Sequence, residues 1–134
     1  MKNLIGQAFG GDLVAITLVA YNLPATTDFY SNKLGLQCIF IDEMSAVYKC
    51  GETLINFLDA GQAPELVAPR KVAPAGTGAN AVYTLRVADV DAVVHELTAA
   101  GVELLNGPMD RPWGVRTASF ADPSGHVWEI ANHK

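Results

Sequence analysis

Apolar and polar positions along the first half of the chain predict one strand, one helix and then three strands. Residues 13–20 (LVAITLVA) form an unbroken apolar run of strand length that is rich in β-branched side chains. Asn22 and Pro24 are typical of a helix start, apolar residues then recur every three or four positions, and Gly35 is typical of a helix end. The pattern therefore predicts a helix over residues 24–34. Turn residues separate the three strands that follow, over residues 36–42, 46–50 and 53–58.

The second half of the chain repeats this order. Residues 80–87 predict a strand, and Asp89 and Gly101 delimit a helix over residues 90–100. The segments LVAYNL (18–23) and LRVADV (85–90) also match, since each carries Asn or Asp directly before its helix. Such an internal duplication indicates two copies of one structural unit. The remaining prediction is a loop over residues 106–114, with strands over residues 102–105, 115–121 and 126–131.

Two segments lie outside the repeat. Residues 1–11 (MKNLIGQAFGG) show no period and predict an arm, either an edge strand or a contact with a partner. Residues 59–79 contain three prolines and three glycines, which indicates a linker or a loop covering a cleft. We expect one domain over residues 1–134, with module one over 12–58, the linker over 59–79 and module two over 80–132. Half a protein of this size leaves one sheet face bare, so two halves must pair.

Composition narrows the class of protein. Half of the 134 residues are hydrophobic and 17% are charged, which favours a folded core over disorder. The net charge is −5 and the basic residues are scattered, so nothing resembles a nucleic-acid surface. The apolar run after residue 12 is too short to span a membrane, and the glycines before it argue against a signal peptide, so we expect a cytoplasmic protein. Cys38 and Cys50 are expected to be reduced thiols in strands.

Two segments resemble the glyoxalase/bleomycin-resistance/extradiol dioxygenase superfamily, also called vicinal oxygen chelate. Residues 111–130 (RPWGVRTASFADPSGHVWEI) carry a D-P-x-G turn followed by Glu129, and residues 22–36 (NLPATTDFYSNKLGL) resemble the D-L, F-Y and L-G-L segment of that superfamily. The resemblance implies an α+β fold in which two βαβββ modules build curved mixed sheets around a ligand cleft. Within the superfamily, the chain is closest in character to metal-independent bleomycin-resistance-like members. The resemblance also implies a homodimer.

The metal enzymes of this superfamily place ligands at four strand positions. The resemblance puts these positions on Ala15, Asn56, Val82 and Glu129, of which Glu129 alone matches a good donor. A divalent ion needs three or four converging N or O donors. We therefore expect no cofactor, with a divalent metal as the disfavoured alternative. The histidines do not complete the set, and surface positions are expected for His95, His126 and His133.

Strand alternation predicts which side chains line the cleft. Glu129 is expected to act as a general base or to hold a cationic group, unless Arg86 or Arg116 pairs with it. Arg111 and Arg116 flank Trp113, which suits stacking on a flat ligand, although Trp113 packing on a dimer partner is the alternative. Besides Trp113, Arg111, Arg116 and Glu129, the candidate ligand-binding residues are Tyr21, Leu54, Asn56, Leu58, Thr84 and Arg86.

These residues lead to two competing functions. The first is a metal-independent protein that binds or sequesters an aromatic or cationic small molecule, as in antibiotic resistance. The second is a lyase, isomerase or dioxygenase that uses Glu129 with or without a divalent metal. We expect a small-molecule ligand and a second copy of the chain as partners, and neither nucleic acid nor membrane.

Overall fold

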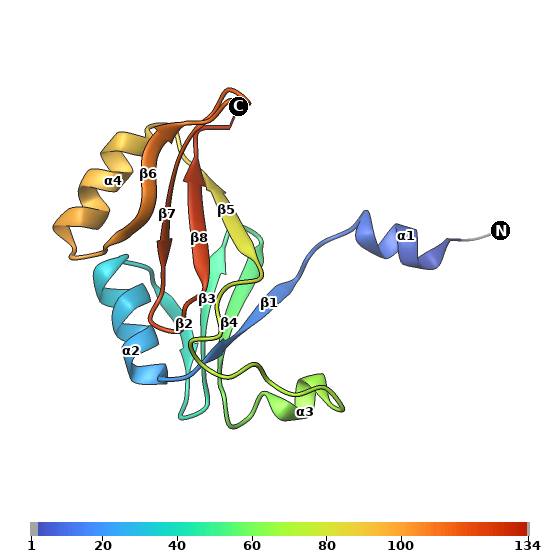
Figure 1. Cartoon of the computed structure of the whole chain (residues 1–134). Helices are drawn as coiled ribbons and strands as arrows, with labels where there is room; N and C mark the ends of the chain where they lie inside the picture. Colours follow the sequence, from blue (N-terminus) through green and yellow to red (C-terminus); the bar gives the residue numbers. More distant parts are fainter. Residues whose placement is uncertain (1–2, 134) are drawn as a thin grey trace.

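Eight strands form two four-stranded mixed sheets, one from each module, in a computed structural model that describes residues 3–133. In both sheets the first and last strands of the module pair in parallel, and the other pairs are antiparallel. The sheets are curved and do not close into a barrel (Figure 1). The predicted α+β fold of two βαβββ modules is therefore confirmed.

The first sheet has the order β1-β4-β3-β2 and contains β1 (Ala15–Ala20), β2 (Cys38–Ile41), β3 (Ser45–Cys50) and β4 (Thr53–Asp59). The second has the order β5-β8-β7-β6 and contains β5 (Val82–Arg86), β6 (Leu104–Asp110), β7 (Arg116–Ala121) and β8 (Val127–Ala131).

One helical segment in each module follows its first strand, as predicted. Helix α2 (Leu23–Thr27) continues into the π-helix η1 (Asp28–Lys33), and α4 covers Val90–Ala99. The side chain of Asn22 accepts a hydrogen bond from the Ala25 N–H, and that of Asp89 accepts one from the Ala92 N–H. These equivalent caps confirm the duplication seen in the sequence. The short helix α3 (Pro64–Val67) interrupts the linker.

One prediction about local structure is wrong, and one of the two alternatives for the arm is excluded. Strand β6 runs through most of the predicted loop of residues 106–114, because its pairing with β7 shifts register on both sides of Asn106 and so accommodates Gly107 and Pro108. An edge strand tolerates Pro108 because it needs no N–H on its outer side. The arm contains the helix α1 (Leu4–Phe9) in place of a strand, and it projects away from the two sheets (Figure 1).

The core forms where the helix-facing sides of both sheets meet. Phe57 of the first sheet and Phe120 and Trp128 of the second belong to one buried cluster with Phe29 and Tyr30, as predicted. The rings of Tyr30 and Trp128 lie 6.4 Å apart, and those of Phe29 and Phe120 lie 6.2 Å apart. The modules therefore pack through these faces, and η1 contributes the aromatic residues that join them.

A buried hydrogen-bond chain crosses the same junction. The Trp128 indole N–H donates to the Tyr30 hydroxyl (2.8 Å), which donates to Asp122 Oδ2 (2.7 Å). Asp122 Oδ1 accepts from the backbone N–H groups of Ser124 and His126. Burial, with the nearby Asp122 carboxylate, raises the pKa of Tyr30 well above its ordinary value. The D-P-x-G turn is thereby fixed to the first module.

Residues 3–133 contain no helix both long and apolar enough to cross a membrane. Cys38 and Cys50 lie in strands as free, half-buried thiols.

Candidate ligand-binding site

Each sheet has an open face that the core leaves free. Because Leu18 and Phe57 lie in the core, alternation places Thr17 and Asn56 on the opposite face of the first sheet. The same register recurs in module two, where Thr84 lies opposite Glu129. Asn56 Nδ2 lies 3.5 Å from Thr17 Oγ1, and Thr84 Oγ1 donates to Glu129 Oε1 at 3.0 Å. The duplication thus gives each open face one polar pair in an equivalent position.

The Glu129 carboxylate is half-buried and forms no ion pair with any residue in the range 3–133. Arg116 instead binds Asp91 (2.8 Å) and Asp110 (3.1 Å). The hydrogen bond from Arg116, together with its charge, lowers the pKa of Asp91. Arg86 shares the face of Glu129 but is exposed and unpaired within the described chain. Neither arginine therefore neutralises Glu129.

Arg111 reaches back from the β6–β7 turn over the open face of the second sheet. Its Nε donates to Thr117 Oγ1 (2.8 Å) and its Nη2 donates to Asn106 Oδ1 (3.1 Å). Thr117 lies on β7 two residues before Ser119, which pairs with Glu129. Thr117 and Asn106 were not among the residues singled out from the sequence, because they become neighbours of Arg111 only when β6 pairs with β7.

Trp113 occupies the tip of this turn and is 67% exposed. The Arg111 guanidinium carbon lies 5.8 Å from the centre of the Trp113 ring. At this distance a cation–π contact forms. Arg111 thus contacts both Trp113 and Thr117, which shares its face of the second sheet with Glu129, whereas Arg116 is tied to α4 through Asp91.

The candidate residues of the first sheet belong to β4 and to the end of β1, on the open face of that sheet. Leu54, Asn56 and Leu58 are half-buried on β4. The Tyr21 hydroxyl donates to the carbonyl of Ala73, so Tyr21 packs against the linker. Because the modules pack through their core-facing sides, the open faces are the sides of the two sheets that remain available to a ligand.

The donor set does not fit a divalent ion. Ala15 precedes Thr17 on one open face and Val82 precedes Thr84 on the other, and neither side chain carries a donor atom. Among residues 3–133, no group of three or more His, Cys, Asp or Glu side chains is placed to hold a metal. The neutral amide of Asn56 and the carboxylate of Glu129 supply too few ligands.

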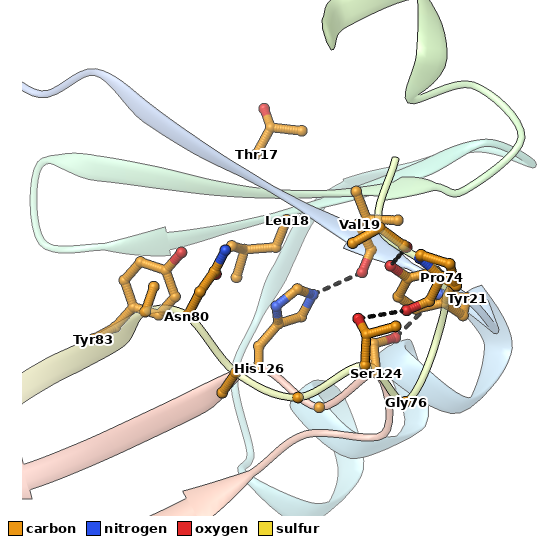
Figure 2. A pocket seen from close by; sticks show the side chains of 16 residues that line it. Thr17, Leu18, Val19, Tyr21, Pro74, Gly76, Asn80, Tyr83, Ser124 and His126 are labelled. Atoms are coloured by element: carbon orange, nitrogen blue, oxygen red, sulfur yellow. Dashed lines mark hydrogen bonds between the residues drawn. The ribbon is translucent and has the colours of Figure 1, made fainter. Parts of the chain in front are cut away.

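His126 has a structural contact that sequence reasoning missed. Its Nε2 lies 2.7 Å from the carbonyl oxygen of Val19, and neighbouring Ser124 Oγ accepts from the Tyr21 N–H (3.1 Å). Both side chains line a cavity of about 310 Å³ between β1, the linker and the turn before β8 (Figure 2). The turn thus contacts the outer edge of the first sheet, and no local sequence signal predicts this contact.

Comparison with known proteins agrees with this architecture. The family model of the Glyoxalase/Bleomycin resistance protein/Dioxygenase superfamily matches residues 12–130. A glyoxalase/bleomycin resistance protein/dioxygenase from Nocardioides has a similar structure (TM-score 0.80, 24% identity, covering 96% of this chain and 89% of that one). A glyoxalase-related enzyme from Fulvimarina pelagi is also similar (0.73, 27%, 90% and 86%), as is lactoylglutathione lyase from Agrobacterium tumefaciens (0.71, 20%, 90% and 92%). The chain therefore belongs to the Glyoxalase/Bleomycin resistance protein/Dioxygenase superfamily.

Proposed function

We propose that this chain is a metal-independent small-molecule-binding protein, which holds an aromatic or cationic compound on the open face of its second sheet. The observation that carries the proposal is the unpaired carboxylate of Glu129. It is half-buried, oriented by Thr84, and free of any ion pair within residues 3–133. A fixed carboxylate of this kind favours a ligand cation, because the ligand would supply the missing opposite charge.

Trp113 supports an aromatic ligand. Its ring is mostly exposed at the tip of the β6–β7 turn, and Arg111 contacts it while hydrogen-bonded to Thr117 and Asn106. The exposed indole of Trp113, beside the Arg111 guanidinium that hydrogen bonds hold in place, offers a flat surface on which a planar ring of a ligand can stack. Ligand pockets commonly combine such an apolar surface with a few placed polar groups.

A second copy of the chain would complete the cleft. One copy leaves Thr84 and Arg86 exposed on the open face of the second sheet, and it also exposes the apolar side chains of α1, with Leu4 at 67%, Ile5 at 73% and Phe9 at 90%. An isolated six-residue helix is unstable in water, and exposed apolar surface of this kind is typical of an interface. A homodimer whose arm packs on the partner would cover this surface and bring two open faces together. The proposed cellular compartment is the cytoplasm, with no nucleic-acid or membrane partner and no cofactor.

Fluorescence titration with acridine orange, a planar aromatic cation, tests the proposal, with naphthalene-2-sulfonate as the anionic comparison. We expect saturable binding of the cation that EDTA does not change. Glu129→Gln and Trp113→Ala should each weaken it at least about fivefold, the effect of losing one charged or aromatic contact. Glu103→Gln is the matched control, since Glu103 is exposed and lies before β6. Absence of saturable binding, loss of binding in EDTA, or an equal effect of Glu103→Gln would overturn the proposal.

A lyase, isomerase or dioxygenase activity that uses Glu129 is the second candidate. The half-buried carboxylate favours it, since a base must lie within hydrogen-bond reach of a bound substrate. The likeness to lactoylglutathione lyase at 20% identity supports only the shared fold. Any turnover measured with a panel of carbonyl substrates should be lost in Glu129→Gln, and turnover that survives this change would exclude Glu129 as the base.

A further inference from the structure

The cavity at the junction of the two modules is separate from the proposed face of the second sheet. It has a volume of about 310 Å³ and lies between β1, residues 73–81 of the linker and residues 124–126 of the turn before β8. Figure 2 shows Tyr83, Asn80 and His126 around it, with Thr17 and Val19 above them. None of Glu129, Arg111 and Trp113 lines it.

One wall of this cavity is the free edge of strand β1. The Leu54 N–H donates to the Val14 carbonyl and the Ala60 N–H donates to the Ala20 carbonyl, so even-numbered residues of β1 face β4. Odd-numbered residues therefore direct their backbone groups to the other edge, where no strand of residues 3–133 pairs with them. The Val19 carbonyl and the Tyr21 N–H confirm this direction, since their partners are His126 and Ser124.

The side chains of His126 and Ser124 form hydrogen bonds with only two backbone groups of this edge, the Val19 carbonyl and the Tyr21 N–H. The N–H and the carbonyl of Thr17, and the N–H of Val19, remain without a backbone or side-chain partner among the described residues. In an extended strand the N–H and carbonyl of one residue point in the same direction. Thr17 thus offers a donor and an acceptor side by side, in a cavity partly shielded by the linker.

The other walls add further hydrogen-bonding groups. A carbonyl oxygen only accepts, so His126 Nε2 donates to Val19. The Tyr83 hydroxyl and the Asn80 amide have no hydrogen-bond partner within residues 3–133. Within the described part of the chain, no Asp, Glu, Lys or Arg lines the cavity. A charged ligand would lose hydration here without gaining a countercharge.

We propose that this cavity binds a small uncharged compound with an amide-type edge, such as a lactam or a related cyclic amide, which pairs with the backbone of Thr17. A ring amide presents its N–H and its carbonyl side by side, which complements the free carbonyl and N–H of one strand residue. Extended peptides add to sheet edges through the same main-chain bonds. A longer strand cannot occupy this edge, because His126 and Ser124 already hold the next positions. The volume is at the lower end of the range for small-molecule pockets.

The first test is an NMR titration of the ¹⁵N-labelled full chain with 2-piperidone, with 1-methyl-2-piperidone as the matched compound. We expect saturable shifts at the Thr17 and Val19 amides with 2-piperidone. The methylated compound keeps the carbonyl but lacks the N–H, so it should bind at least about fivefold more weakly. Equal affinities for the two compounds, or no saturable shift at these two amides, would overturn the proposal.

Two linker variants locate the site. Ala79→Leu places a larger side chain in the cavity wall and should abolish the shifts, whereas Ala75→Leu, an exposed linker position outside the lining, should leave them unchanged. Equal effects of the two variants would overturn the proposed location. The inference does not depend on the proposed face of the second sheet, since Glu129→Gln should leave 2-piperidone binding intact.

Discussion

The buried chain of hydrogen bonds from Trp128 through Tyr30 to Asp122 makes Tyr30→Phe an informative perturbation. The variant removes one hydroxyl and leaves the ring in place, so it creates almost no cavity. Tyr30 is 2% exposed and Trp128 is 6% exposed, so water does not readily replace the lost oxygen. Tyr30 belongs to module one, whereas Asp122 and Trp128 belong to module two. The variant therefore tests how strongly this network joins the modules.

The expected loss follows from the two partners that the variant leaves behind. The Trp128 indole N–H, which can only donate, becomes a buried unsatisfied donor at about 1–3 kcal/mol. Asp122 loses a hydrogen bond to a charged group, worth about 1.5–3 kcal/mol, although its other oxygen keeps two backbone donors. Because one local rearrangement around the missing hydroxyl reduces both costs, they do not add in full. We therefore expect a decrease of about 3 kcal/mol in the free energy of unfolding.

Urea unfolding at pH 7, followed by far-UV circular dichroism, measures this loss. Tyr48→Phe is the matched control, because the neighbours of the Tyr48 hydroxyl, the Ser31 hydroxyl and the Cys38 thiol, belong to half-buried residues. We expect about 1 kcal/mol for this control. A loss below about 1 kcal/mol for Tyr30→Phe, or equal losses for the two variants, would refute the reasoning.

The same hydroxyl gives a dependence on alkaline pH. The pKa of Tyr30 in the folded protein is raised above its ordinary value of about 10 by burial and by Asp122. The contribution of Tyr30 is therefore fully present below pH 10 and lost as pH rises above 10, where the unfolded chain ionises first. The expected slope is about −1.4 kcal/mol per pH unit for this one proton, and Tyr30→Phe should lack it. Equal slopes in the two proteins would contradict the raised pKa.

Three further predictions concern the backbone, an ion pair and the arm. Gly107→Ala should lower the free energy of unfolding by about 2–4 kcal/mol, because at φ +83° the added Cβ would lie 2.5 Å from a β7 carbonyl oxygen. Gly114→Ala, at φ +97° in open space, should lower it by only about 1–2 kcal/mol. Equal losses for the two variants in urea unfolding would contradict this prediction. Arg116→Gln should return the pKa of Asp91 towards its ordinary range in an NMR titration. The stabilisation from the lowered pKa is complete above the unfolded value of about 3.9 and is lost as pH falls through the folded pKa, so the stability difference between the two proteins should shrink over that range. Phe9→Ser should weaken the proposed homodimer in sedimentation equilibrium, and an unchanged dissociation constant would argue against an arm contact.

Contacts between residues distant in the sequence explain what the local pattern did not predict. Strand β6 was predicted to end before Asn106 because Gly107 and Pro108 favour loops, yet the ladder with β7 continues past them through register shifts. The ligand-binding role of Arg116 stays a prediction, but its ion pair with Asp91 was not expected, because it forms only when α4 packs beside β7. In both cases a partner distant in the sequence overrides the local preference.

The sequence by itself determined the two βαβββ modules, their caps and the core membership of Phe57, Phe120 and Trp128. These features depend on short-range periodicity and on side chains that satisfy neighbouring backbone groups. Only the tertiary structure decided that the modules pack through their core-facing sides, that Glu129 has no ion pair among residues 3–133, and that His126 contacts the edge of β1. Those outcomes depend on register and on the docking of one module against the other, which bring together residues about a hundred positions apart.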